Sequence, residues 1–149
     1  MIKAAPQQTT MAAGCTCLRL RKAARRVSQI YDQYLAGTGL TITQFSLLGH
    51  IRAYDEIGIG ALAEKLVMDA STLTRNLRPL ERRELVAMKP DRADRRGRRL
   101  TLTRAGRDAF SAARPAWEQA QRHIAEAIGP GDGAALAVTI DNLLDRLAG

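Results

Sequence analysis

Residues 69–82 read DASTLTRNLRPLER, a stretch whose apolar and basic positions follow the period of an α-helix. When these residues are placed about 100° apart on a helical wheel, Leu73, Leu77 and Leu80 gather on one side, which must be buried. The opposite side is polar and basic, and it consists of Ser71, Arg75, Arg78 and Arg82. One helix therefore has a core face and an arginine face.

An arginine face of this kind favours a helix that reads DNA, because the major groove admits an α-helix and a guanidinium bonds bidentately to guanine. We expect Arg75 and Arg78 to contact bases and Arg82 to contact a phosphate. Hydroxyl groups near the start of the same helix can bond phosphates or base edges, aided by the helix dipole. They belong to Ser71, Thr72 and Thr74. The alternative is an ordinary solvated face.

Two further helices are expected ahead of this one. Thr41, followed three residues later by Gln44, fits a capping box that opens a helix. The apolar side of that helix consists of Phe45, Leu48 and Ile51. A shorter helix should run from about Ile59 to Leu66, and Asp69 can then cap the arginine-bearing helix by accepting its unpaired amides. The predicted pattern is helix, short turn, helix.

Over residues 85–102 the apolar period becomes alternating, which predicts a two-stranded β-hairpin with a charged tip. Five of the nine residues from 91 to 99 are arginines, and a basic finger beside a major-groove helix can reach the minor groove. The arginines expected to do so are Arg95, Arg96 and Arg98. Gly97 should allow a sharp turn, and Asp91 or Asp94 should orient an arginine, since phosphate repels carboxylate. The alternative is a solubilising loop.

The charge of the chain points to a polyanionic partner. Its 149 residues carry a formal net charge of +8. Residues 75–107 contain twelve Arg or Lys against four acids, so this segment alone holds an excess equal to that of the whole chain. No nucleophile with a base partner, Gly-rich phosphate loop or metal-ligand spacing is present, so we expect no catalysis, no metal and no cofactor.

Helices at both ends of the chain offer apolar stripes that a lobe of about 65 residues cannot cover alone. They are predicted over residues 17–35, from a Thr103 cap to residue 128, and over residues 132–147. A homodimer is the economical way to cover them. The fold class is therefore mainly α with a small β-hairpin, in which a winged helix-turn-helix lobe joins dimerisation helices from both termini. Its parts are a disordered N-terminal tail (1–14), a first dimerisation helix (15–40), the DNA-binding lobe (41–103) and C-terminal dimerisation helices (104–149).

The sequence also bears on where the protein works. It has no run of about 18 consecutive apolar residues, and its first 14 residues lack the apolar segment of a signal peptide. Its two cysteines, Cys15 and Cys17, are too few for a disulfide framework. We therefore expect a cytoplasmic protein with no membrane partner.

Five short motifs, in order and in register, resemble the MarR (multiple antibiotic resistance regulator) family of winged helix-turn-helix transcriptional regulators. They are TQFSLL (43–48), LAEKL (62–66), DASTLTR (69–75), LERR (80–83), and DRR (94–96) continuing to LTLT (100–103). The resemblance covers about residues 18–147 and implies a recognition helix at 71–83 and a wing at 89–99. Glu84 departs from the family, which commonly has glycine there, and Pro79 predicts a kink in the recognition helix.

Members of this family typically repress genes and release DNA when a small aromatic ligand or an oxidant acts on them. The resemblance therefore implies an obligate homodimer that regulates transcription from a pseudopalindromic duplex operator. The cleft residues that it implies for the aromatic ligand are Phe45, His50, Tyr54 and Trp117. For each of them the alternative is core packing or a satisfied surface hydrogen bond. The alternative function is a winged-helix module for protein contacts or for sequence-blind DNA packaging.

Oxidation would act on Cys15 and Cys17, which lie at the start of the first helix, where unpaired amides can favour the reactive thiolate. Residues two apart on a helix point in different directions, so a bridge between subunits is easier than one within a subunit. The alternative is a pair of small residues buried at an interface.

Overall fold

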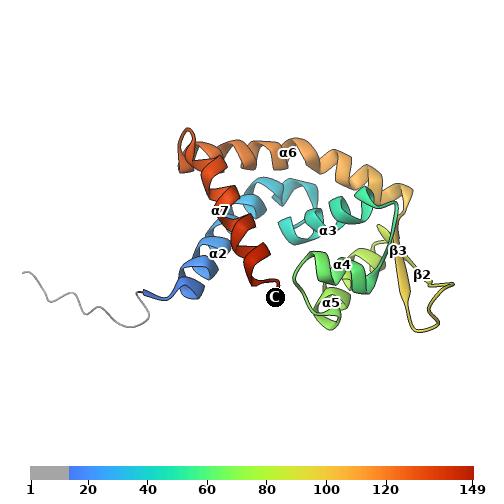
Figure 1. Ribbon diagram of the computed structural model, residues 1–149. Helices are drawn as coiled ribbons and strands as arrows, with labels where there is room; N and C mark the ends of the chain where they lie inside the picture. The colour runs from blue at the N-terminus through green and yellow to red at the C-terminus, as the bar shows by residue number, and fades with distance from the viewer. Residues whose placement is uncertain (1–13) are drawn as a thin grey trace, which may run out of the picture.

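The computed structural model describes residues 14–149, so the predicted N-terminal tail lies outside it except for its last residue. Its helices are α2 (Thr16–Leu35), the short 3-10 helix η1 (Ala36–Thr38), α3 (Ile42–Ala53), α4 (Ile59–Lys65), α5 (Ala70–Arg82), α6 (Arg104–Ile128) and α7 (Asp132–Leu147). Its strands are β1 (Glu56–Gly58), β2 (Val86–Pro90) and β3 (Arg98–Leu102). Figure 1 shows α4, α5 and the sheet gathered at one end of the molecule and α2 and α7 at the other. The fold is mainly α with a small sheet, as predicted.

The sheet contains one strand more than the predicted hairpin. Its three antiparallel strands lie in the order β1-β3-β2. In the central strand β3, Thr101 lies opposite Glu56 of β1 and opposite Ala87 of β2. Only Ile57 is buried in β1, and three residues are too few to show an alternating pattern. The missing strand could therefore not be distinguished from a loop.

The core face of α5 is buried as predicted. Leu73, Leu77 and Leu80 are each 0% exposed. They belong to one cluster with side chains of α2, α3, α4 and the sheet, among them Leu35, Phe45, Leu48, Ile51, Leu62, Val86 and Leu100. Burying one aliphatic side chain of this size contributes about 1.5–3 kcal/mol. This packing fixes the rotation of α5 and leaves its other face outward.

Three helices begin at the polar residues predicted to cap them. Thr41 forms a full capping box at the start of α3. Asp69 Oδ1 accepts a hydrogen bond from the Thr72 amide at 2.8 Å at the start of α5. Thr103 Oγ1 accepts one from the Gly106 amide at 2.9 Å at the start of α6. Each cap gives a partner to an amide that the helix itself cannot satisfy.

Three helix ends in this fold use left-handed residues that are not glycine. They are Asp55 (φ 56°) after α3, Val67 (φ 51°) after α4 and Glu84 (φ 55°) after α5. After α5, the Leu85 amide donates to the Leu80 carbonyl at 2.9 Å, as in a Schellman motif, and α4 ends with the same pattern. A left-handed backbone costs a residue with a Cβ about 1–2 kcal/mol. The left-handed cap of α5 thus forms at Glu84 without glycine. The helix continues past Pro79, and the kink expected there stays a prediction.

The first turn of α6 lies directly on the chain that follows α5. Thr103 Oγ1 donates to the Glu84 carbonyl at 2.6 Å. A Cβ atom at Gly106 would lie 2.0 Å from the Leu85 carbonyl oxygen. Atoms do not approach that closely, so only glycine fits at this position. The absence of a side chain is what lets α6 dock on the lobe.

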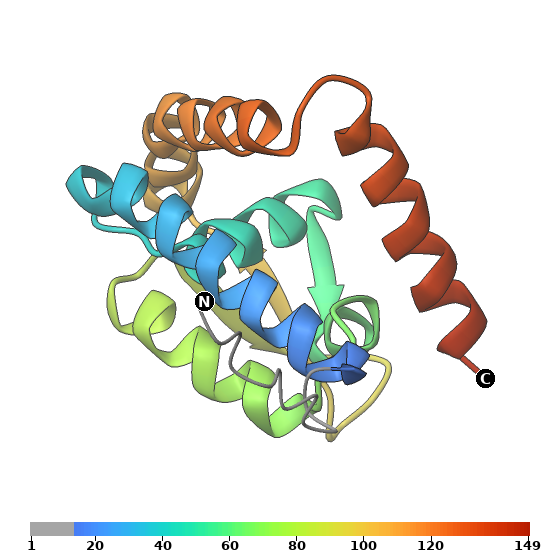
Figure 2. The same cartoon turned by 90° about the vertical axis from the view of Figure 1, so that its left-hand side faces the viewer.

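Large apolar side chains are exposed near both ends of the chain. No residue of α7 is buried, and Figure 2 shows this helix standing apart from α2. The exposed apolar residues of α7 and of the first half of α2 are Leu136, Val138, Ile140, Leu144, Leu147, Leu18 and Leu20. None of the helices in residues 14–149 combines the length and the apolar character that a membrane span requires. The apolar stripes predicted at the two ends are therefore present and open to solvent in a single chain.

Candidate functional site

The arginine face of α5 points to solvent. Arg75, Arg78 and Arg82 are all exposed. In the part of the chain that the structure describes, none of the three guanidinium groups has a hydrogen bond or an ion pair. Arg83 differs, because its Nη1 donates to the Gly39 carbonyl at 2.7 Å and so ties the end of α5 to the turn before α3. Three cations on one face of α5 are thus available to an outside partner.

Hydroxyl groups at the start of α5 already donate their hydrogens within the helix. Ser71 Oγ donates to Asp69 Oδ1 at 2.6 Å, and Thr72 Oγ1 donates to Asp69 Oδ2 at 2.9 Å. Thr74 Oγ1 donates to the Ala70 carbonyl at 2.8 Å. While these bonds hold, the three oxygens have free lone pairs that can accept from base amino groups, and donating to a phosphate would require one of the hydroxyl groups to leave its present acceptor.

The carboxylate of Asp69 is held in its charged form by the same contacts. The hydrogen bond from the Ser71 hydroxyl, followed by those from the Thr72 amide and hydroxyl, lowers the pKa of Asp69 to about 2. Sequence reasoning identified Asp69 only as the helix cap. The structure adds that it sets the direction of the neighbouring hydroxyl groups.

The arginines in and next to the turn between β2 and β3 are exposed. They are Arg92 and the three predicted DNA contacts, Arg95, Arg96 and Arg98. The two aspartates of the tip hold backbone amides rather than these side chains: Asp91 Oδ1 accepts from Ala93 N–H, and Asp94 Oδ1 accepts from Arg96 N–H. The tip is therefore a hydrogen-bonded loop that presents its arginines outward.

Gly97 lies close to the two aspartates of this loop. A Cβ atom at this position would lie 3.1 Å from the Asp91 Cβ and 3.3 Å from the Asp94 Cβ. The backbone of Gly97 does not adopt a left-handed conformation. Tight packing against the two aspartates, rather than a left-handed turn, therefore favours glycine at this position.

Arg99 is separated from the other arginines of the tip. Its Nε bonds to Glu56 Oε1 at 2.7 Å, and its Nη1 lies 3.6 Å from Asp91 Oδ2. Sequence reasoning counted it only as part of the basic run. Its partner Glu56 lies in β1, the strand that the sequence did not reveal, so no local pattern could have identified the pair.

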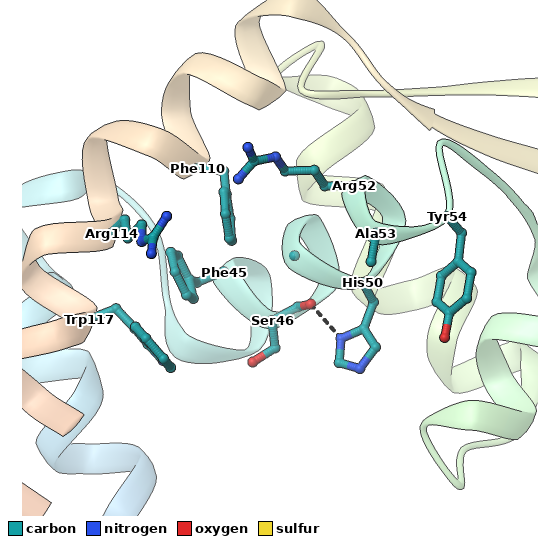
Figure 3. Close-up of a pocket in the computed structure, with 10 residues that line it drawn as sticks. Phe45, Ser46, His50, Arg52, Ala53, Tyr54, Phe110, Arg114 and Trp117 are labelled. Atoms are coloured by element: carbon teal, nitrogen blue, oxygen red, sulfur yellow. Dashed lines mark hydrogen bonds between the residues drawn. The ribbon is translucent and has the colours of Figure 1, made fainter.

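A cavity of about 480 Å³ lies between α3 and α6 (Figure 3). All four residues expected in a ligand cleft line it, namely Phe45, His50, Tyr54 and Trp117. The other lining residues are Ser46, Gly49, Arg52, Ala53, Phe110 and Arg114. The Phe45 ring stacks on Phe110 with 4.5 Å between centroids and on Trp117 with 5.7 Å. The cavity therefore has a stacked aromatic wall.

Polar groups around this cavity are mostly basic. The Arg52 guanidinium lies 5.3 Å from the centre of the Phe110 ring, and Arg114 pairs with Glu118 at 2.9 Å. His50 Nδ1 lies 2.8 Å from the Ser46 carbonyl oxygen. Because a carbonyl only accepts, Nδ1 donates in this contact. The sequence could have indicated Phe110 and Arg114, which share a face of α6 with Trp117 at helical spacing.

Cys15 and Cys17 are both free and exposed at the start of α2. Cys15 is the N-cap residue of α2. The structure thus places both thiols within reach of an oxidant, and their role in redox sensing stays a prediction.

Comparison with known proteins gives the family. Residues 40–97 match the model of the MarR family. The regulator SarZ of Staphylococcus epidermidis is 29% identical over 92 residues, which is 62% of this chain and 62% of SarZ. The chain thus matches less than two thirds of the length of this relative.

Two solved structures share the fold over nearly their full length. The M. tuberculosis transcriptional regulator MosR, solved in complex with DNA, is 36% identical with a TM-score of 0.79 and covers 89% of this chain and 95% of its own. Bordetella bronchiseptica BpsR, whose DNA binding is regulated by 6-hydroxynicotinic acid, is 26% identical with a TM-score of 0.79 and the same coverage. With the winged helix-turn-helix geometry described above, these matches show that the chain belongs to the MarR family.

Proposed function

We propose that this protein is a homodimeric, sequence-specific DNA-binding regulator of transcription. The observation that carries the proposal is the division of α5 into a fully buried leucine face and an outward face with three unpaired arginines. MosR, the similar regulator, was solved with DNA. A helix held this firmly with guanidinium groups outward suits the major groove.

In the proposed complex α5 reads bases. Arg75 and Arg78 contact guanine edges, and Arg82 contacts a phosphate. The hydroxyl oxygens at the start of α5 accept from base amino groups, because their hydrogens are already donated within the helix. Three arginines of the β2–β3 hairpin, Arg95, Arg96 and Arg98, enter the adjoining minor groove.

A second copy of the chain is the proposed partner of the exposed apolar stripes on α2 and α7. Each of these helices exposes large aliphatic side chains, and α7 buries none in the single chain. A symmetric pair would present two α5 helices to half-sites about 34–36 Å apart on a pseudopalindrome. Dimerisation would thus determine the spacing of the operator.

The proposed outcome is repression that ends when a small aromatic molecule occupies the cavity between α3 and α6. Its support is the aromatic wall of Phe45, Phe110 and Trp117 with basic groups beside it. BpsR, which has the same fold, is regulated by 6-hydroxynicotinic acid. Oxidation of the exposed Cys15 and Cys17 is the second proposed signal.

The proposal is tested by selecting bound duplexes from a random pool, first with the protein alone and then with 6-hydroxynicotinic acid or hydrogen peroxide added. A regulator should enrich a pseudopalindrome, and Arg75→Ala should relax the preference at one base position of each half-site. Arg122→Ala removes an exposed arginine near the far end of α6 and serves as the matched control. No enrichment would favour sequence-blind packaging, and no DNA binding would favour a module for protein contacts.

A further inference from the structure

Arg99 connects the lobe to the tip of the wing, the β2–β3 hairpin with its tip at residues 91–97. Each of its three guanidinium nitrogens faces an oxygen. Nε bonds to Glu56 Oε1 at 2.7 Å, Nη2 donates to the Glu56 carbonyl at 3.3 Å, and Nη1 lies 3.6 Å from Asp91 Oδ2. One side chain therefore bridges β1 and the first residue of the tip.

Asp91 is the residue on which the tip is built. Its amide donates to the Gly97 carbonyl at 3.0 Å, and its Oδ1 accepts from the Ala93 amide at 2.8 Å. Its side chain is only 17% exposed, although it lies in a charged loop. A change at Asp91 would therefore move the backbone that carries the exposed arginines.

Arg99 is the residue of β3 at which pairing with β1 ends. Gly58 opposite Arg99 is the last pair between β1 and β3. Beyond it, Arg98 pairs only with Pro90 of β2, and the tip follows. From this point outward the hairpin is two strands wide, and the contacts of Arg99 connect its first tip residue to β1.

Given the proposed DNA-binding function, we propose that Arg99 is a positioning residue rather than a DNA contact. Clamped by Glu56 and Asp91, it holds the wing at the angle from which Arg95, Arg96 and Arg98 reach the minor groove. Its positive charge is matched by two carboxylates, so little of it remains for a phosphate. Glu56 thereby supports DNA binding although its own charge repels DNA.

The substitution Glu56→Gln distinguishes the clamp from a simple charge effect, because the two predict opposite changes in DNA affinity. If the carboxylate acted only by repelling phosphate, its removal would tighten binding. If it holds Arg99, its removal should weaken binding by roughly two- to fivefold, the range expected for a partly exposed ion pair. Asp55→Asn is the matched control, because it removes the neighbouring exposed carboxylate without touching the clamp, and Asn tolerates the left-handed φ of 56° at that position.

The experiment measures the affinity of the full-length protein for its selected duplex at several salt concentrations, together with amide hydrogen exchange of residues 91–97. The clamp predicts weaker binding and faster exchange at the tip for Glu56→Gln, and no weakening for Asp55→Asn. Arg99→Lys keeps the charge but cannot span both carboxylates, so it should behave like Glu56→Gln. The double variant should be no weaker than either single one.

Tighter or unchanged binding by Glu56→Gln, with tip exchange unchanged, would overturn the clamp while leaving the proposed function intact. Full affinity in Arg99→Lys, with a salt slope that falls by about one charge only in Arg99→Ala, would overturn it in favour of a direct phosphate contact. If the unmodified protein binds no duplex at all, the proposed function fails and the positioning role fails with it.

Discussion

Replacing Val67 with glycine should stabilise the folded protein. Val67 adopts a left-handed backbone with φ 51° in the turn between α4 and α5. That conformation costs about 1–2 kcal/mol for a residue with a Cβ, and β-branching makes it less favourable still. The side chain is 78% exposed, so its removal loses little burial. Glycine also makes the unfolded chain more flexible, which destabilises the folded state by about 0.5–1 kcal/mol. The net gain in the free energy of unfolding is therefore on the order of 0.5–1 kcal/mol.

Thermal unfolding at fixed protein concentration measures this gain, because the midpoint of the proposed dimer would depend on concentration. A gain of this size should raise the Tm by roughly 1–4 °C for a chain of this length. Val67→Asn is the informative companion, since asparagine tolerates the left-handed region while keeping a side chain, and it should also raise the Tm. Both variants unfolding below the unmodified protein would refute the view that backbone strain dominates at this turn.

Three further outcomes are expected. Arg75→Ala should cost about 1–3 kcal/mol of operator binding and relax base preference, whereas Arg82→Ala should weaken all duplexes alike and lower the salt slope by about one, as measured by salt-dependent titration. The depressed pKa of Asp69 means that its contribution to stability is complete above about pH 4 and is lost as the pH falls toward about 2. Between these pH values, the free energy of unfolding in urea should therefore fall less for Asp69→Asn than for the unmodified protein. Gly106→Ala should destabilise the fold by about 1–3 kcal/mol despite the better helix propensity of alanine, because its Cβ meets the Leu85 carbonyl; a rise in Tm would contradict the observed docking.

The features that the sequence predicted well are those encoded within a few neighbouring residues. The two faces of α5 follow from spacing alone, and the caps at Thr41, Asp69 and Thr103 follow from side-chain chemistry beside the first amides. Each of these signals lies within one turn or one helix. The helix boundaries at both ends of the chain were predictable for the same reason.

The features that it did not predict depend on residues far apart in the chain. β1 is recognisable only through its pairing with β3, more than forty residues later, and the contact between Arg99 and Glu56 depends on that pairing. The direction of the Ser71 and Thr72 hydroxyl groups is a local feature that was also missed, because Asp69 becomes their acceptor only once the helix has formed. Sequence spacing identifies the donors but not the acceptors.

The missing side chain at Gly106 has a mechanical consequence for the whole molecule. α6 contains 25 residues, so it is about 37 Å long, and its first turn is pressed against the carbonyl that follows α5. The turns of α6 before Pro115 are held against that carbonyl, so they should move together with α5. Pro115 removes one backbone hydrogen bond in the middle of α6, which lets the far half of the helix bend relative to the near half. A movement of α5 should therefore be passed along α6 as far as Pro115.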